Sequence, residues 1–217
     1  MKIAVLGTGA VGRALAGRLA ALGHDVALGT RDPESTTARG DVAAWAAEHP
    51  GVPVATFAEA ATGAELLINA TSGEHSIAAL EAAGEANLAG KVVLDAANHM
   101  SFANGYPEVG HNETESLAER LQRAFPQARV VKSLNTMNSD VMVEPRKVAG
   151  GDHTVFVSGD DPEAKRAVTA LLTEMGHTDV LDLGGIESAR GAELALGFWL
   201  RVASGVGHFA FNFKIAR

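Results

Sequence analysis

The sequence predicts an α/β fold built on a doubly wound, mainly parallel sheet and followed by a small C-terminal helical part. Short apolar runs alternate with helical patterns over most of the chain, and a glycine turn of the form G-x-G-x-x-G follows the first apolar run. No linker rich in Pro, Ser or Gly divides these elements. Such alternation is typical of a parallel sheet. We place this domain at residues 1–183 and the C-terminal helical segment at residues 184–217.

The first unit consists of a strand at residues 2–6, the glycine turn, a helix and a second strand at residues 26–28. Gly7 permits a tight turn, Gly9 lets a pyrophosphate approach the backbone, and Gly12 allows the helix to pack closely. The N-terminus of the helix offers N–H groups and a positive dipole end to an anion. The turn residues predicted to bind the phosphates of a dinucleotide are Gly7, Thr8, Gly9, Ala10, Val11 and Gly12.

The end of the second strand favours NADP(H) over NAD(H). An NAD site usually carries an Asp or Glu here, which binds the ribose 2′-hydroxyl. This chain has Thr30 and Arg31 instead, and a guanidinium matches the oxygens of a 2′-phosphate. Asp32 follows at once, but Pro33 turns the chain away, so we interpret Asp32 as a turn or helix-capping residue.

The next elements continue the alternation. We expect an irregular polar segment at 33–40, a helix at 42–49, a short strand at 52–56 and a short helix at 57–62. Pro53 cannot donate to a strand ladder, which indicates an edge position or the start of a strand.

A buried strand at residues 65–70 precedes a helix at 76–83. Ligands bind outside the carboxyl ends of such strands, so Ala70, Thr71 and Ser72 are predicted to lie beside the cofactor. Capping of the following helix is an equally open role for Thr71 and Ser72.

The second half of the domain contains longer loops. We expect strands at 91–95, 129–134, 153–159 and 178–183, an irregular stretch at 96–110, and an irregular flap over the cleft at 142–152. Capping boxes at 112–115 and 116–119 predict a helix that begins in this region and ends at Phe125. Asp161 and Pro162 begin another helix, which ends near Gly176.

A final helix is expected at about residues 187–213, and it is apolar around most of its circumference. Charged residues interrupt the apolar runs, which excludes a membrane span. A second copy of the chain is the obvious cover for this surface, so we predict a homodimer. The residues predicted in its interface are Leu196, Phe198, Trp199 and Phe209.

Composition excludes several classes of function. The 217 residues are 47% hydrophobic and 20% charged, with a net charge of −8, which disfavours nucleic-acid binding. Arg13, Arg31 and Lys132 are the local cations expected near anionic ligands. The absence of cysteine excludes thiolate chemistry, and no two histidines have the i, i+4 spacing of a helical metal site, so no metal is expected. No signal-peptide pattern begins the chain, which favours the cytoplasm.

Five segments carry a more specific pattern than the glycine turn alone: residues 7–12, 29–31, 95–98, 131–136 and 159–161. Many dehydrogenases share the turn, whereas Asp-x-x-Asn at 95–98 and Val-Lys-x-x-Asn-Thr at 131–136 are less common. Together, and in order along nearly the whole chain, these segments resemble the family of coenzyme F420-dependent NADP oxidoreductases.

This resemblance implies a Rossmann domain in which a hydride passes between NADPH and the deazaflavin F420. Such a transfer asks for ring stacking and exclusion of water rather than for acid–base catalysis by side chains. The residues then expected to position the two rings are Asn98, Asn135, Thr136 and Met137, with Asn98 also contacting NADP(H). Hydrogen bonding of Asn98 and Asn135 to loop backbone is the structural alternative.

The residue at position 135 leaves more than one electron acceptor possible. Archaeal members of the family carry His at this position, whereas Asn is typical of bacterial relatives and of the related domain in membrane ferric reductases, which uses flavin. An NADPH-dependent reductase of flavin or another acceptor, and a non-catalytic NADP(H)-binding module, therefore remain alternatives. Imine reductases share the early motifs but append a larger helical domain.

Overall fold

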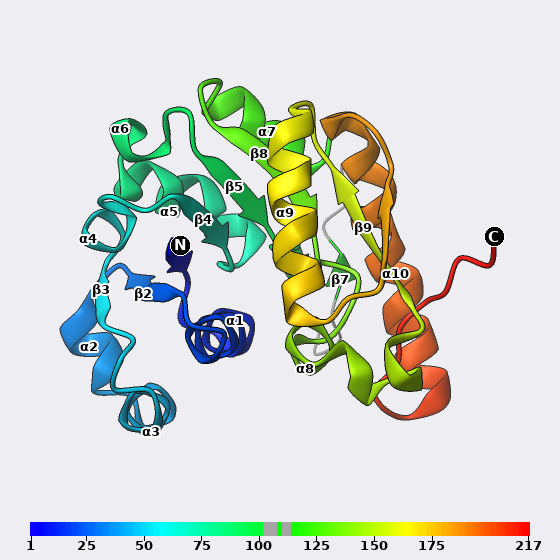
Figure 1. The fold of residues 1–217 in the computed structure, drawn as a ribbon, viewed down its shortest axis with the longest axis horizontal. Helices are drawn as coiled ribbons and strands as arrows, with labels where there is room; N and C mark the ends of the chain where they lie inside the picture. Colours follow the sequence, from blue (N-terminus) through cyan, green and yellow to red (C-terminus); the bar gives the residue numbers. More distant parts are fainter. Residues whose placement is uncertain (102–107, 110–113) are drawn as a thin grey trace.

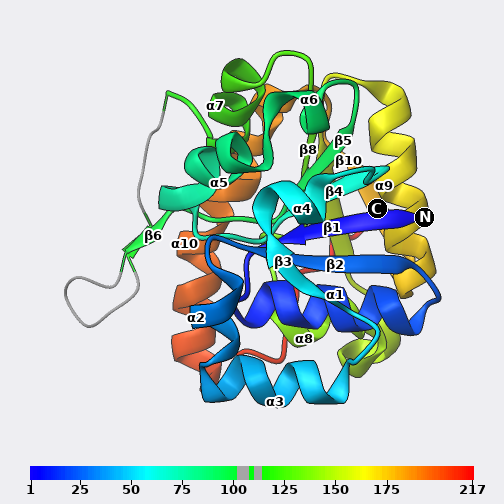
Figure 2. The same ribbon diagram turned by 90° about the vertical axis from the view of Figure 1, so that its left-hand side faces the viewer.

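The computed structural model describes residues 1–101, 108–109 and 114–217 of the chain. Its centre is an eight-stranded sheet with the order β10-β9-β8-β5-β4-β1-β2-β3 (Figures 1 and 2). The strands are β1 (Lys2–Leu6), β2 (Asp25–Thr30), β3 (Val54–Thr56), β4 (Leu66–Asn69), β5 (Val92–Asp95), β8 (Arg129–Ser133), β9 (Thr154–Ser158) and β10 (Asp179–Asp182). The third strand lies at an edge of the sheet, which is one of the two positions that Pro53 indicates.

Six neighbouring strands, from β3 to β8 in the sheet order, are parallel. β9 runs antiparallel to β8 and is in turn parallel to β10. The antiparallel ladder is short, because only Lys132 and Ser133 of β8 face Ser158 and Val157 of β9. The order of the strands reverses beside β1, so β1 and β4 flank the point where ligands of open α/β sheets bind.

Helices cover both faces of this sheet, which confirms the doubly wound α/β fold (Figure 1). One face is packed by α1, α8 and α9, through residues such as Leu15, Met142 and Leu172. The other face is packed by α4 to α7, through residues such as Leu80 and Leu121. The helices are α1 (Ala10–Ala21), α2 (Pro33–Thr37), α3 (Gly40–Glu48), α4 (Phe57–Ala61), α5 (Ser76–Ala83), α6 (Glu85–Leu88), α7 (Leu117–Ala124), α8 (Ser139–Val143), α9 (Pro162–Met175) and α10 (Ala189–Val206).

Three segments expected to be irregular contain regular structure. Residues 33–40 include the helix α2, whose N-terminus is capped by Asp32. The stretch 96–110 includes the antiparallel pair β6 (Met100–Ser101) and β7 (Glu108–Val109). The expected flap at 142–152 consists of the end of α8 and two turns of 3₁₀ helix, η2 (Pro145–Lys147) and η3 (Ala149–Gly151).

The helix predicted from the capping boxes is confirmed as α7, and Ser116 and Glu119 form its box. The alternative box at 112–115 begins outside the described residues. Two further turns of 3₁₀ helix complete the fold: η1 (Gly73–His75) and η4 (Ile186–Ser188).

The C-terminal helix is shorter than expected, because α10 ends at Val206 and Gly207 follows in a left-handed conformation. The tail beyond it is extended and returns to the helix. Phe209 and Phe211 stack on Trp199, with ring centroids 5.4 and 5.3 Å away. Trp199 and Leu196 are therefore buried within one chain. The prediction that a second copy is needed to cover these two residues is wrong. The exposed large apolar residues of the C-terminal segment are Leu194, Phe198, Val206, Phe209 and Ile215.

The described residues contain neither a candidate membrane span nor a candidate metal cluster. None of their helices combines the length and the apolar character that crossing a bilayer requires. They also contain no cluster of three or more His, Cys, Asp or Glu side chains that could hold a metal ion.

Candidate dinucleotide site

In the glycine turn between β1 and α1, the chain itself leaves no room for a side chain at Gly7 or Gly12. Gly7 has φ +115°, and a Cβ there would lie 2.5 Å from the carbonyl oxygen of Ala70. A Cβ at Gly12 would lie 1.9 Å from the carbonyl oxygen of Gly7, so the helix can pack here only without a side chain. A Cβ at Gly9 would meet no atom of the described chain within 4 Å. The space beside Gly9 is therefore free for a ligand.

The N-terminus of α1 suits an anion. Gly9 is the N-cap, no side chain caps the helix, and its first turn has no acidic residue. Arg13, one of the cations expected here, donates to the carbonyl oxygen of Thr8 at 2.7 Å and pairs with Asp41 at 2.9 Å. Backbone N–H groups and the helix dipole thus remain as the main attraction for phosphate.

A cavity of about 490 Å³ opens beside this turn. It contains eight of the predicted cofactor residues: Gly7, Thr8, Gly9, Thr30, Arg31, Ala70, Thr71 and Ser72. The predicted residues Ala10, Val11, Gly12 and Asn98 are outside its lining. The remaining wall combines polar groups with an apolar floor, from Thr36, Arg39, Phe57, His75, Ala78, Ala79 and Ala82.

The end of β2 presents the positive group expected for a 2′-phosphate. Arg31 is exposed and lines the cavity, while the hydroxyls of Thr30 and Thr36 lie 2.8 Å apart. Asp32 accepts from the backbone N–H groups of Glu34 and Ser35, and the bond from Ser35 is the main cause that lowers the pKa of its carboxyl. Its carboxylate is therefore engaged as the helix cap.

Arg39 is a second cation at the cavity that the sequence did not single out. It reaches this wall because α2 folds residues 33–37 into a helix, and it also pairs with Asp41 at 3.0 Å. The signal that could have found it is the Asp-Pro-Glu start of that helix at residues 32–34.

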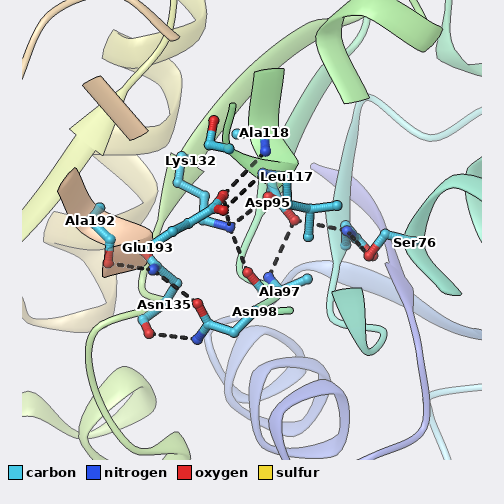
Figure 3. A network of polar contacts seen from close by, with 12 residues as sticks. Ser76, Asp95, Ala97, Asn98, Leu117, Ala118, Lys132, Asn135, Ala192 and Glu193 are labelled. Carbon is cyan, nitrogen blue, oxygen red and sulfur yellow. Dashed lines mark hydrogen bonds and ion pairs between the residues drawn. The ribbon is translucent and has the colours of Figure 1, made fainter. Parts of the chain in front are cut away.

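The residues predicted to position the reacting rings lie at the ends of β5 and β8 (Figure 3). Asn98 donates to the backbone carbonyl of Asn135 at 2.7 Å. Asn135 donates to the side-chain oxygen of Asn98 at 3.1 Å and to the carbonyl of Ala192 at 2.9 Å. Thr136 and Met137 are buried, and the Met137 sulfur lies 4.0 Å from the amide of Asn212 in the tail. The structure thus brings Asn98 and Asn135 together, with both amides bonded inside the protein.

Lys132 was expected to meet an anionic ligand, and the structure corrects this. Its side chain is fully buried, and its ammonium lies 2.8 Å from Asp95 and 3.0 Å from Glu193 of α10 (Figure 3). Burial alone lowers the pKa of a lysine, but the two carboxylates outweigh it and raise the pKa of Lys132. The sequence could not reveal this pairing, because Glu193 lies far along the chain.

Comparisons with known proteins identify the family of this chain. The family model described as coenzyme F420-dependent NADP oxidoreductase matches residues 2–99. The F420-dependent NADP reductase of Methanothermobacter marburgensis is 32% identical over 198 residues, which cover 88% of this chain and 87% of that protein. A crystal structure from Arthrobacter sp. FB24, provisionally described as an F420-dependent NADP reductase, is 57% identical, with a TM-score of 0.97 and complete coverage of both chains.

The metalloreductase STEAP3 of Rattus norvegicus is also 32% identical, over 194 residues. The match covers 88% of this chain but 36% of STEAP3, so this chain spans about a third of that protein's length. The similarity to the archaeal reductase over most of both chains, the matched family model and the glycine turn lead to one assignment. The chain belongs to the family of coenzyme F420-dependent NADP oxidoreductases.

Proposed function

We propose that this protein is an NADP-dependent oxidoreductase that transfers a hydride between NADPH and coenzyme F420. The observation that carries the proposal is the similarity to the archaeal F420-dependent NADP reductase, because the match spans 87% of that protein. Its named activity therefore needs little beyond the region that this chain shares. The cavity at the carboxyl edge of the sheet is the place where we expect NADPH to bind.

The residues at the cavity fit the NADP half of this proposal. The open face of Gly9 and the N-terminus of α1 would hold the pyrophosphate, and the guanidinium of Arg31 would bind the 2′-phosphate. The apolar side chains of Phe57, Ala78 and Ala82 in the cavity lining suit the adenine.

When both coenzymes are bound, the chemistry they supply is a hydride transfer from nicotinamide C4 to deazaflavin C5, which oxidises NADPH and reduces F420 with uptake of one proton from water. The protein would hold the two rings face to face and exclude water. The proposed positioning residues are Asn98, Asn135, Thr136 and Met137, and no side chain acts as an acid or base.

A second candidate function is NADPH-dependent reduction of a flavin or another acceptor. Two observations favour it: Asn stands at position 135, and the metalloreductase STEAP3 is as similar in identity as the archaeal enzyme. A module that binds NADP(H) without turnover is the third.

The test is to mix purified protein with NADPH and F420 and to follow the visible absorbance of oxidised F420. We expect the absorbance to bleach faster than FMN or riboflavin is reduced at equal concentration. Reduction of flavin with F420 left oxidised would replace the first proposal by the second. Absence of turnover with all three acceptors, despite NADPH binding, would favour the third.

The variant Asn135→His sharpens this assay. A histidine that contacts the deazaflavin would improve turnover of F420. A histidine that only replaces the contacts of Asn135 within the protein would not. Because Asn135 is buried and its amide bonds to Asn98 and Ala192, we expect no improvement. A faster reaction would mean that position 135 reaches the acceptor.

A further inference from the structure

Two polar networks meet where β4, β5 and β8 end (Figure 3). The first is the reciprocal amide pair of Asn98 and Asn135, which joins the segments that follow β5 and β8. Asn135 extends this network to α10 through the carbonyl of Ala192. The pair therefore fixes three parts of the chain relative to one another.

The second network surrounds the ammonium of Lys132. Its three acceptors are Asp95 at 2.8 Å, the carbonyl of Ala97 at 2.5 Å and Glu193 at 3.0 Å. Glu193 also accepts from the backbone N–H groups of Leu117 and Ala118 at the start of α7. An ammonium has three donors, and each of them has a partner here: two lie at the end of β5 and the third lies on α10.

At two places, a residue of one network is adjacent in sequence to a residue of the other. Ala97, which accepts from Lys132, precedes Asn98. Ala192, which accepts from Asn135, precedes Glu193. A change in the bonds of the ammonium would therefore shift the backbone on both sides of the amide pair.

The ammonium network also reaches the dinucleotide cavity. The second oxygen of Asp95 accepts from the amide of Asn69 at 2.8 Å, and the side-chain oxygen of Asn69 accepts from the hydroxyl of Thr71 at 2.7 Å. Thr71 lines the cavity. One chain of bonds thus connects the cavity wall to α10 through Asp95, Lys132 and Glu193.

A buried ion network is costly to desolvate, and apolar side chains of the same volume often stabilise a fold at least as well. Stability alone therefore gives little reason for charges at this place. A dinucleotide crosses the point where the strand order reverses. With its adenosine half beside Arg31, its nicotinamide half would extend over the ends of β4, β5 and β8, where the amide pair lies.

We propose that Lys132 and Glu193 are positioning residues that hold the Asn98 and Asn135 pair in place for the nicotinamide half of NADPH. This inference rests on the proposed function, because it takes the ligand to be NADPH. Neither residue touches the ligand. They act through the backbone of Ala97 and Ala192 and through the two asparagines.

The test compares Glu193→Gln with a matched control, Glu119→Gln. Both carboxylates join α7 to α10: Glu119 pairs with Arg190 and accepts from Ser116, but it has no bond to Lys132 or to the amide pair. For each variant, dissociation constants are measured for NADPH and for 2′,5′-ADP, which keeps the adenosine and the 2′-phosphate but lacks the nicotinamide.

We expect Glu193→Gln to weaken NADPH binding by about tenfold while 2′,5′-ADP binding changes by less than about twofold. The control is expected to leave the ratio of the two constants unchanged. A second pair of variants separates this effect from poor folding. Lys132→Met leaves the buried carboxylate of Asp95 and the half-buried one of Glu193 without their lysine, whereas Asp95→Asn with Lys132→Met removes the buried one. Thermal melting reports their folding, and the ratio of the two constants should change in the same direction.

Equal weakening of both ligands by Glu193→Gln, or weakening of neither, would overturn the proposal and leave the network a purely structural role. These binding measurements do not depend on the acceptor. A wild-type protein that binds NADPH but leaves F420 oxidised would refute the proposed acceptor and leave the positioning test intact. A wild-type protein that binds neither nucleotide would refute both.

Discussion

Two glycines of the turn after β1 are required for different reasons, so substituting each one should affect either NADPH binding or the stability of the fold. Gly12 faces the backbone of Gly7, whereas Gly9 faces open space. We expect Gly9→Ala to abolish NADPH binding while the free energy of unfolding changes by less than about 0.5 kcal/mol. Gly12→Ala should destabilise the fold by about 3 kcal/mol, because its methyl group would overlap a carbonyl oxygen.

Urea unfolding and NADPH titration of both variants check this contrast. Each variant serves as the control for the other, since both add one methyl group to the same motif. Normal NADPH binding by Gly9→Ala would place the pyrophosphate elsewhere.

Arg31 tests the preference for NADP(H) at the scale of one side chain. It is exposed at the cavity wall, so its removal should cost little stability. Arg31→Ala is expected to weaken NADPH binding by about 1.5–3 kcal/mol, the size of one lost charge-assisted contact, and to affect NADH binding far less. The measurement is a titration with each coenzyme.

The control for Arg31→Ala is Arg166→Ala, which makes the same change in net charge on the exposed face of α9. It should alter neither dissociation constant. An unchanged preference in Arg31→Ala would mean that another group, such as Arg39, holds the phosphate.

At the scale of single elements, the parallel strands could be predicted because they are short apolar runs bounded by turns. The helix α2 was not predicted, although its N-terminal signal is the one that predicts α9. Asp32-Pro33-Glu34 carries the same N-terminal signal as Asp161-Pro162-Glu163, which correctly predicts α9. The residues after Pro33 are polar and show no apolar helical face, so they do not predict a helix. The helix that forms there is stabilised by its Asp32 cap.

Part of the candidate site could be predicted from the sequence, and part of it could not. Residues next to a strand end, such as Thr30 and Thr71, could be placed at the cavity because strand ends share one edge of a parallel sheet. The partners of Lys132 could not, since a lysine beside a ligand and a lysine between two buried carboxylates look the same in sequence. Only the packing of α10 brings Glu193 to it.

The tail after α10 gives a prediction at the element scale. Phe211→Ala should lower the free energy of unfolding by about 1.5–3 kcal/mol and shift the fluorescence of Trp199 to longer wavelength, because a partly buried ring that covers the indole is lost. The measurement is made in a Trp45→Phe background, so that one tryptophan remains.

Phe209→Ala is the matched control, because Phe209 also stacks on Trp199 but is 52% exposed. We expect it to cost less than about 1 kcal/mol. Equal effects of the two substitutions would mean that the tail does not hold the arrangement described for it.

At the scale of the whole molecule, the C-terminal segment contacts the sheet in two places, through α10 and through the tail that follows it. Glu193 joins α10 to Lys132 of β8, and Ala192 joins it to Asn135 after β8, while the backbone N–H of Thr154 in β9 donates to the carbonyl of Phe213 in the tail. The helix is thus held both at the candidate site and at the far strands. The same helix also presents exposed apolar side chains.

That surface leads to the last prediction, a homodimer formed through the exposed residues of α10 and its tail. Phe198 is 64% exposed, and Leu194, Val206 and Phe209 are exposed in the same segment, so several large apolar side chains are available for an interface. Sedimentation at micromolar concentration should therefore give about twice the 22.4 kDa of one chain. Phe198→Glu should shift the protein to monomer, because the dimer would bury an unpaired carboxylate. The control Leu183→Glu places the same charge on an exposed leucine after β10 and should leave the dimer intact. A wild-type protein that sediments as one chain would refute the interface, and α10 would then carry its apolar side chains for the binding of another molecule.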